Sequence, residues 1–246
     1  MTALPMSAPV RSVLARQLLW RKSVAVLRMH FTDPTTMVVF PAALLGSIFA
    51  ITLIVWTLIP GDGGQGWGEM SIYCFLAGIS ALAVTRSLPF SLGMGSSRRA
   101  FVLGTLLTNL VLAVGWGVVL FVMLRIEKAS GGWGQHVHFF WWDWYARSAW
   151  PAVLLLQITS LAAAFALGVL LAALWVRWNR LALVVGGPAA VVVLGGVAIL
   201  LTSRHWWGGI TGWLGGLTPL AAAGLCAALL VVLLACQYAV LRRVRG

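Results

Sequence analysis

Residues 88–104, LPFSLGMGSSRRAFVLG, form a short, polar and glycine-rich interruption between two long apolar runs. Pro89 is expected to end or bend the first run, and the glycines that follow it favour a break in any continuing helix. Ser96 or Ser97 is a suitable N-cap for a helix that restarts at the basic pair Arg98-Arg99. The segment therefore predicts a tight, structured turn that reverses the chain at one face of a membrane.

The composition on either side of this turn is that of a membrane protein. Of the 246 residues, 61% are hydrophobic and only 9% are charged. A soluble domain carries about a quarter charged residues. The apolar runs do not alternate apolar with polar residues, so they favour helices over the strands of a β-barrel. We therefore predict an all-α membrane protein.

Six apolar runs approach the roughly 20 residues that a helix needs to cross a bilayer core. The predicted spans cover residues 37–59, 70–88, 100–124, 149–176, 181–201 and 217–241. Within the fifth run, Gly186-Gly187-Pro188 is expected to kink the helix. The chain thus divides into a leader, residues 1–36, and a six-span transmembrane domain, residues 37–246.

The leader is basic and partly amphipathic. Between residues 10 and 31, apolar side chains alternate with five basic residues, Arg11, Arg16, Arg21, Lys22 and Arg28. This composition favours a helix that lies in the headgroup layer, because long basic side chains reach the interface from most positions. A solvated basic tail is the alternative interpretation.

Basic residues also orient the chain. The leader, the 88–104 turn, the connection after the fourth span and the C-terminal tail hold most of the 17 lysines and arginines. The opposite connections hold only Arg125, Lys128, Arg147 and Arg204, together with most of the acids. The positive-inside rule therefore places both termini and the turn in the cytoplasm, in a multi-pass protein of the cell membrane. Basic residues that flank spans predict contact with membrane lipid and argue against nucleic-acid binding.

Residues suited to catalysis or metal binding are few. His136 and His138, with Glu127 and Asp143 nearby, are the one group that suggests a metal site or a membrane enzyme acting on lipids. An HxH pair in a loop is weak support for either, and interfacial polar residues are the simpler interpretation. No hydrolase, zinc-protease or P-loop motif is present. We therefore assign no catalytic residue, metal or cofactor to this chain.

Polar residues within the predicted spans are uncharged. Thr105 and Asn109 on the third span, and Gln157 and Ser160 on the fourth, are candidates for lining a cavity. For Asn109 and Gln157, hydrogen bonds between helices are an equal alternative. No acidic or basic residue lies deep in a predicted span, which argues against proton- or ion-coupled transport. If the protein moves a cargo, its energy is expected to come from outside the chain.

The predicted outer face is rich in tryptophan, for example Trp133, Trp141, Trp142 and Trp144. Indole rings prefer the membrane interface, because they combine an apolar body with one N–H donor. An interfacial belt explains the pattern, and a docking surface for lipids or lipopeptides is the bolder alternative.

The six spans, the cytoplasmic termini, the basic leader and the turn together resemble the permease subunits of type-two ABC exporters, in their small bacterial form. Such subunits join their second and third spans by a segment of this kind. The residues that carry the resemblance here are Phe90, Leu92, Gly93, Arg98, Arg99, Phe101, Gly104 and Thr105. The chain departs from larger members of the family because its outer connections are too short for a large extracellular domain.

The resemblance implies a coupling helix in the turn, which contacts a separate cytoplasmic ABC ATPase. We call this segment the coupling elbow; its residues are Phe90, Leu92, Gly93, Met94, Gly95, Ser96, Arg98 and Arg99. The resemblance further implies that the leader forms a connecting helix, that a second permease, an identical copy or a similar partner, completes the transporter, and that ATP and Mg²⁺ bind only to the ATPase. In the family the last outer loop can carry short re-entrant helices, and the glycines and tryptophans of residues 202–216 are candidates for such helices, an assignment that the sequence leaves open.

We therefore expect a transport subunit that is not itself an enzyme and that exports an amphipathic cargo. The alternative is a membrane-embedded scaffold or immunity protein, in which the coupling elbow is only a topological turn.

Overall fold

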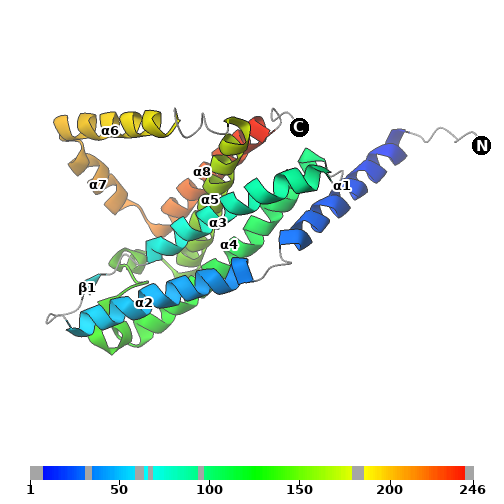
Figure 1. The fold of residues 1–246 in the computed structure, drawn as a ribbon. Coiled ribbons are helices and arrows are strands. Elements are labelled where there is room, and N and C mark those ends of the chain that lie inside the picture. The colour runs from blue at the N-terminus through cyan, green and yellow to red at the C-terminus, as the bar shows by residue number, and fades with distance from the viewer. Residues whose placement is uncertain are drawn as a thin grey trace, which may run out of the picture.

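The computed structural model describes residues 8–30, 35–58, 64–65, 69–93, 97–178 and 186–241, and most of them are helical (Figure 1). The elements in chain order are α1 (Ala8–His30), a π-helical turn η1 (Thr35–Val39), α2 (Phe40–Leu58), β1 (Gly64–Gln65), α3 (Glu69–Gly93), α4 (Arg98–Ala129), a second π-helical turn η2 (Gly132–His136), β2 (Val137–His138), a 3-10 helix η3 (Asp143–Arg147), α5 (Trp150–Trp178), α6 (Gly187–Ser203), α7 (Trp207–Gly216) and α8 (Pro219–Leu241). Strands β1 and β2 form one short parallel pair.

Five helical stretches in the described part of the chain are long and apolar enough to cross a membrane. They are Thr35–Leu58, Glu69–Leu88, Arg98–Ala129, Trp150–Trp178 and Pro219–Val240. The chain is thus a multi-span helical membrane protein, as predicted, and these five stretches correspond to five of the six predicted spans.

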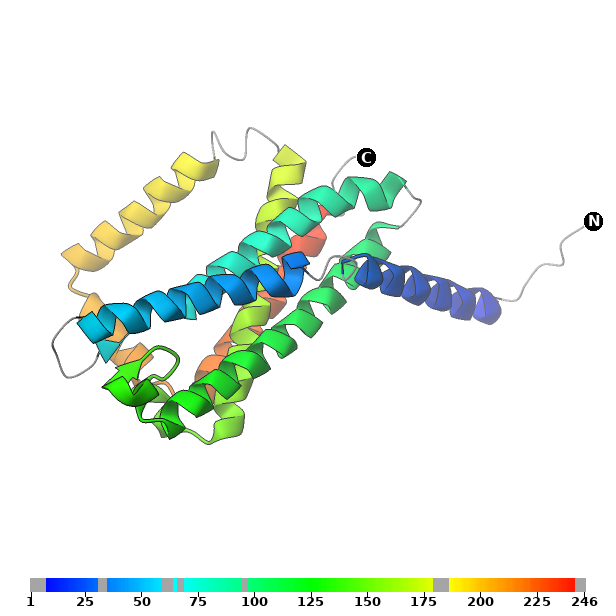
Figure 2. The same ribbon diagram turned by 60° about the horizontal axis from the view of Figure 1, so that its bottom comes forward.

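The predicted span 181–201 is represented by α6. This helix has 17 residues, or about 25 Å at 1.5 Å per residue, which is shorter than the roughly 30 Å of a bilayer core. Residues 181–185 lie outside the described residues. Pro188 sits in the first turn of α6, where a proline is tolerated, so within the described helix it does not produce a mid-helix kink. Helix α6 lies apart from the other spans in Figures 1 and 2, and the sixth span stays a prediction.

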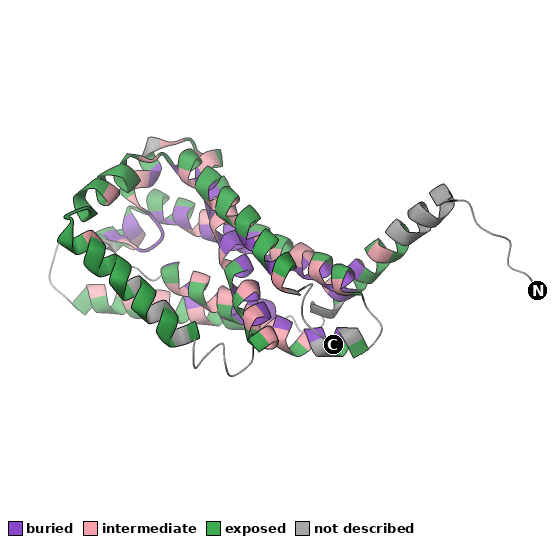
Figure 3. Ribbon diagram, turned by 90° about the horizontal axis from the view of Figure 1, so that it is seen from above, coloured by how far each residue is buried: buried purple, intermediate pink, exposed green. Residues whose placement is uncertain are grey.

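Helix α5 is the centre of the bundle. Helices α3, α4 and α8 pack around it, and the buried residues gather where these helices meet (Figure 3). At Gly168 of α5, a Cβ atom would collide with the Ala77 carbonyl oxygen and lie 2.6 Å from Ser80 Oγ. The Ser80 hydroxyl also donates to the Phe165 carbonyl oxygen at 2.9 Å. The small residue therefore allows α3 and α5 to approach closely, as small residues do in other membrane bundles.

Helix α3 continues through Pro89 and ends at Gly93. Of the two outcomes predicted for Pro89, an end or a bend of the helix, the end is therefore wrong, and the bend stays a prediction. Leu88 is buried in the same apolar cluster as Phe101 of α4, and this packing holds the last turns of α3 against the next helix. Tertiary contacts thus outweigh the local preference of proline to stop a helix.

Candidate functional site

The coupling elbow comprises the last residues of α3, the connection and the first residues of α4. Phe90 is 59% exposed, Leu92 and Gly93 form the end of α3, and Met94, Gly95 and Ser96 lie outside the described residues. Ser97 caps α4, because its side-chain oxygen accepts a hydrogen bond from the Ala100 N–H at 3.2 Å. Arg98 is half-buried and Arg99 is exposed in the first turn of α4. An aromatic ring and two guanidinium groups are thus presented at one end of the bundle.

Helix α1 packs against α4 next to the elbow. The contact lies at Gly104, where a Cβ atom would be 2.6 Å from Val26 Cβ and 2.7 Å from the Ser23 carbonyl oxygen. Both Ser23 and Val26 are fully buried, whereas Leu18 and Trp20 are more than half exposed. Helix α1 therefore has one narrow buried face on α4 and leaves apolar and basic side chains on its surface.

A single apolar cluster lies beneath this region. Its buried members come from four helices: Val26 of α1, Val84 and Leu88 of α3, Phe101 of α4, and Val169, Ala172 and Ala173 of α5. Val240 of α8 packs against the same cluster. The cluster therefore connects the ends of α3 and α4 that flank the elbow with α1, α5 and α8.

Substituting alanine for Gly104 is expected to release α1 from α4, because the new methyl group would overlap the α1 backbone and Val26. Amide hydrogen exchange in residues 19–28 should become about tenfold faster, equivalent to roughly 1.4 kcal/mol. Gly115→Ala on the same helix is the matched control, because no atom lies within 4 Å of that Cβ position. Equal exchange in the two variants would contradict the packing.

A small cavity opens between α4, α5 and α8, beyond the elbow. Thr105 and Asn109 line it together with Gln237 of α8. Its volume of about 30 Å³ holds roughly two water molecules. Within the described residues, Thr105 Oγ1 is buried without a hydrogen-bond partner. The cavity is too small for an amphipathic molecule in this conformation.

Gln157 and Ser160 do not line this cavity. Gln157 Nε2 lies 3.5 Å from Glu69 Oε1, and Ser160 Oγ lies 3.2 Å from the Tyr73 hydroxyl oxygen. Both side chains join α5 to α3 near the other end of the bundle. For Gln157 this is the alternative that the sequence left open, a hydrogen bond between helices.

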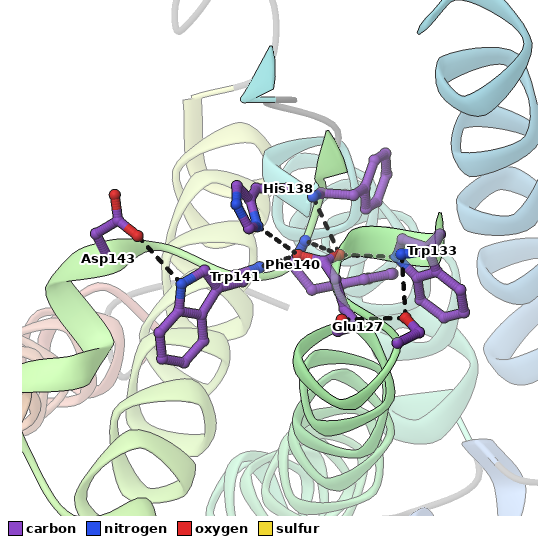
Figure 4. Close-up of polar contacts among 8 residues, drawn as sticks. Glu127, Trp133, His138, Phe140, Trp141 and Asp143 are labelled. Carbon is purple, nitrogen blue, oxygen red and sulfur yellow. Dashed lines mark hydrogen bonds and ion pairs between the residues drawn. The ribbon is translucent and has the colours of Figure 1, made fainter. Parts of the chain in front are cut away.

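That other end contains a fully buried carboxylate, Glu127. Its Oε2 atom accepts hydrogen bonds from the N–H groups of Phe139 at 3.1 Å and Phe140 at 2.9 Å, and from Trp133 Nε1 at 2.9 Å. Its Oε1 atom accepts from the Trp141 N–H at 2.8 Å. Figure 4 shows these groups converging on the end of α4. The loop after α4 is therefore folded around one acidic side chain.

Two cationic side chains at the end of α4 lie over tryptophan rings of the loop and of α5. Arg125 Cζ lies 4.1 Å from the ring centroid of Trp150, and Lys128 Nζ lies 4.4 Å from that of Trp141. Such contacts contribute about 0.5–1 kcal/mol at exposed sites. They fix the start of α5 against the end of α4.

Among the described residues, His136 and His138 are not grouped with Glu127 and Asp143 as metal ligands. His138 Nδ1 is 3.7 Å from Glu127 Oε1, while Asp143 Oδ1 accepts a hydrogen bond from Trp141 Nε1 at 3.3 Å. His136 adopts a left-handed backbone conformation with φ 56°. Across the part of the chain that the structure describes, no three His, Cys, Asp or Glu residues are grouped as metal ligands.

Glu69 is a second buried acid at this end, at the first residue of α3. It is 5% exposed, and Glu127, Trp142 and Tyr73 are the neighbours that act on it. Tyr145 packs nearby: burial raises the pKa of its phenol well above the usual range, Glu69 adds to the rise, and a hydrogen bond with Gln157 opposes it. The phenol therefore stays neutral over the ordinary pH range.

The sequence did not single out Glu69 and Glu127 as buried residues, because both fall at the ends of apolar runs, where acids are usually solvated. A signal was present in the dense aromatic segment of residues 139–145, FFWWDWY. Such a segment is too apolar to lie in water and so is expected to fold back onto the helix ends.

The fold and these sites define a multi-span helical membrane protein with two structured ends. No family model, curated protein or solved structure matches the chain.

Proposed function

We propose that this chain is the membrane subunit of an ATP-driven exporter, with ATP hydrolysed by a separate cytoplasmic ABC ATPase. The observation that carries the proposal is the coupling elbow beside α1. Phe90 exposes 59% of its surface near the end of α3, and Arg99, nine residues further along, is exposed in the first turn of α4. Aromatic and arginine side chains are among the residues that protein interfaces favour.

The packing under the elbow supports a mechanical role. The ATPase, on closing around ATP, would displace the elbow and α1, and the shared cluster of Val26, Leu88 and Phe101 would pass this movement to α3, α4 and α5. A two-state change of this kind needs a difference in contact energy between its states. The ATPase would act on the elbow. The Ser97 cap of α4 and the cluster that contains Leu88 and Phe101 fix the elbow to the bundle.

The cargo path would lie between this subunit and a second copy or a similar permease. The cavity beside Thr105 and Asn109 would be its inner end, opened only when the helices move. The uncharged, mainly apolar lining favours an amphipathic cargo over a small ion.

The double variant Arg98→Glu, Arg99→Glu is expected to abolish co-purification of an ABC ATPase from the native membrane and to leave insertion of the chain intact. Charge reversal removes attraction to an acidic surface and adds repulsion. The measurement is mass spectrometry of the affinity-purified complex, together with ATP-dependent export in reconstituted vesicles.

Arg204→Glu, a reversal on the exposed segment after α6, is the control and should retain the ATPase. Capture that survives the double variant would disprove the coupling role. Absence of any ATPase from the wild-type complex would instead favour a scaffold or immunity protein.

A further inference from the structure

Two buried carboxyl groups, those of Glu69 and Glu127, lie at the end of the bundle opposite the elbow. The charge of Glu127 acts on Glu69. Glu127 accepts hydrogen bonds from four N–H groups and lies 3.7 Å from His138, a set of donors that suits an ionised carboxylate. Glu69 has side-chain donors instead, with Gln157 Nε2 at 3.5 Å and hydrogen bonds with Tyr73 and Trp142, which oppose the effects of burial and of the Glu127 charge. The two acids are therefore not equivalent.

Glu69 also lacks a compensating cation among the described residues. No ion pair joins it to a described Lys, Arg or His side chain, and the charged group that acts on it is the acid Glu127. A second negative charge in this buried place would be opposed both by loss of hydration and by repulsion. The arrangement favours one ionised and one neutral carboxyl group.

Gln157 supplies an independent observation. It is 1% exposed, its amide points at Glu69, and its Oε1 atom is buried with no hydrogen-bond partner among the described residues. The two ends of an amide are exchanged by a half-turn. After that turn, Oε1 faces Glu69 as an acceptor, which is the partner that a protonated carboxyl group requires and an ionised one cannot use.

We propose that Glu69 is a proton-binding site, and that its carboxyl group donates a hydrogen bond to the side-chain carbonyl oxygen of Gln157. Binding adds one proton from water to the Glu69 carboxylate and moves no electrons. The proton joins the start of α3 to α5, beside the loop that Glu127 organises. The site is independent of the proposed export function, since it uses none of the elbow residues.

The surroundings determine how the site responds to pH. The titratable groups that interact with Glu69 are Tyr73 on α3, Glu127 on α4 and Tyr145 on η3. One step further out, His138 on β2 lies beside Glu127 and Cys226 on α8 acts on Tyr73. None of them provides a fixed positive charge. A carboxyl group that is neutral when folded and ionised when unfolded stabilises the fold at low pH, and this stabilisation is lost as the pH rises.

Infrared spectroscopy of the full chain in lipid nanodiscs tests the proposal. Glu69 and Glu127 are the only glutamates in the sequence, so ¹³C-labelled glutamate reports on these two groups alone. At neutral pH the wild type should show one labelled carboxylic-acid band and one labelled carboxylate band. Glu69→Gln should lose the acid band and keep the carboxylate band of Glu127.

A wild-type spectrum with carboxylate bands only would overturn the proposal, whatever the variants do. An acid band that persists in Glu69→Gln would also overturn it, because the proton would then belong to Glu127. Gln157→Leu, which removes the acceptor, should shift the loss of the acid band to lower pH, and an unchanged titration would exclude the partner role of Gln157.

Stability gives a second readout. The thermal midpoint of the wild type should fall as the pH is raised from neutral, while that of Glu69→Gln should stay flat, because glutamine has the shape of the neutral acid. Parallel curves for the two proteins would count against the site.

Discussion

Replacing Glu127 by alanine is expected to lower the free energy of unfolding by about 4 kcal/mol or more. The substitution leaves four N–H donors without their acceptor, and each unsatisfied buried donor costs about 1–3 kcal/mol. The backbone donors belong to Phe139, Phe140 and Trp141, all buried. The loop after α4 should therefore detach from the bundle.

Chemical unfolding in detergent micelles, followed by tryptophan fluorescence, measures the effect. Asp143→Ala is the matched control in the same loop, since Asp143 is exposed and accepts one hydrogen bond, from Trp141 Nε1 at 3.3 Å. Its effect should stay below about 1 kcal/mol. If both alanine variants unfold alike, Glu127 does not organise the loop.

Gly168→Ala should have the next largest effect, a loss of about 2 kcal/mol or more. The added methyl group would collide with the Ala77 carbonyl oxygen, which belongs to the backbone of α3 and cannot turn aside. The helices would have to separate, and the hydrogen bond from Ser80 to Phe165 would lengthen. Size-exclusion chromatography after stepwise heating would show earlier loss of the monodisperse protein.

Gly78→Ala on α3 is the control for this substitution, because its Cβ position has no neighbour within 4 Å. It should be neutral or stabilising by up to about 1 kcal/mol, since alanine is the better helix former. Destabilisation of both variants to the same degree would mean that glycine content, and not the α3–α5 contact, sets the stability.

Much of the architecture was predictable because hydrophobicity is a local property. Five of the predicted spans correspond to apolar helices in the structure, and Ser97 caps α4 as one of the two expected caps. The leader forms a helix, and residues 207–216 form a short one. In each case the residues that predict the element are neighbours in the sequence.

Contacts between distant stretches were not predictable in this way. Glu69 and Glu127 sit at span ends, where the sequence suggests solvated acids, yet both are buried. Gln157 and Thr105 look alike as polar residues in apolar helices, but one reaches an acid on α3 and the other lines a cavity. Glycines at 104 and 168 cannot be told from those at 78 and 115 by sequence alone.

Apolar content and charge distribution therefore establish that the chain is a multi-span helical membrane protein, because transfer of each residue into a bilayer depends mainly on its own side chain. Tertiary packing decided that Glu69 and Glu127 are buried and that Gly104 and Gly168 contact the backbone of a neighbouring helix. It also decided that α3 continues past Pro89. These outcomes depend on partners far away in the sequence, whose positions follow from the packing of whole helices around α5.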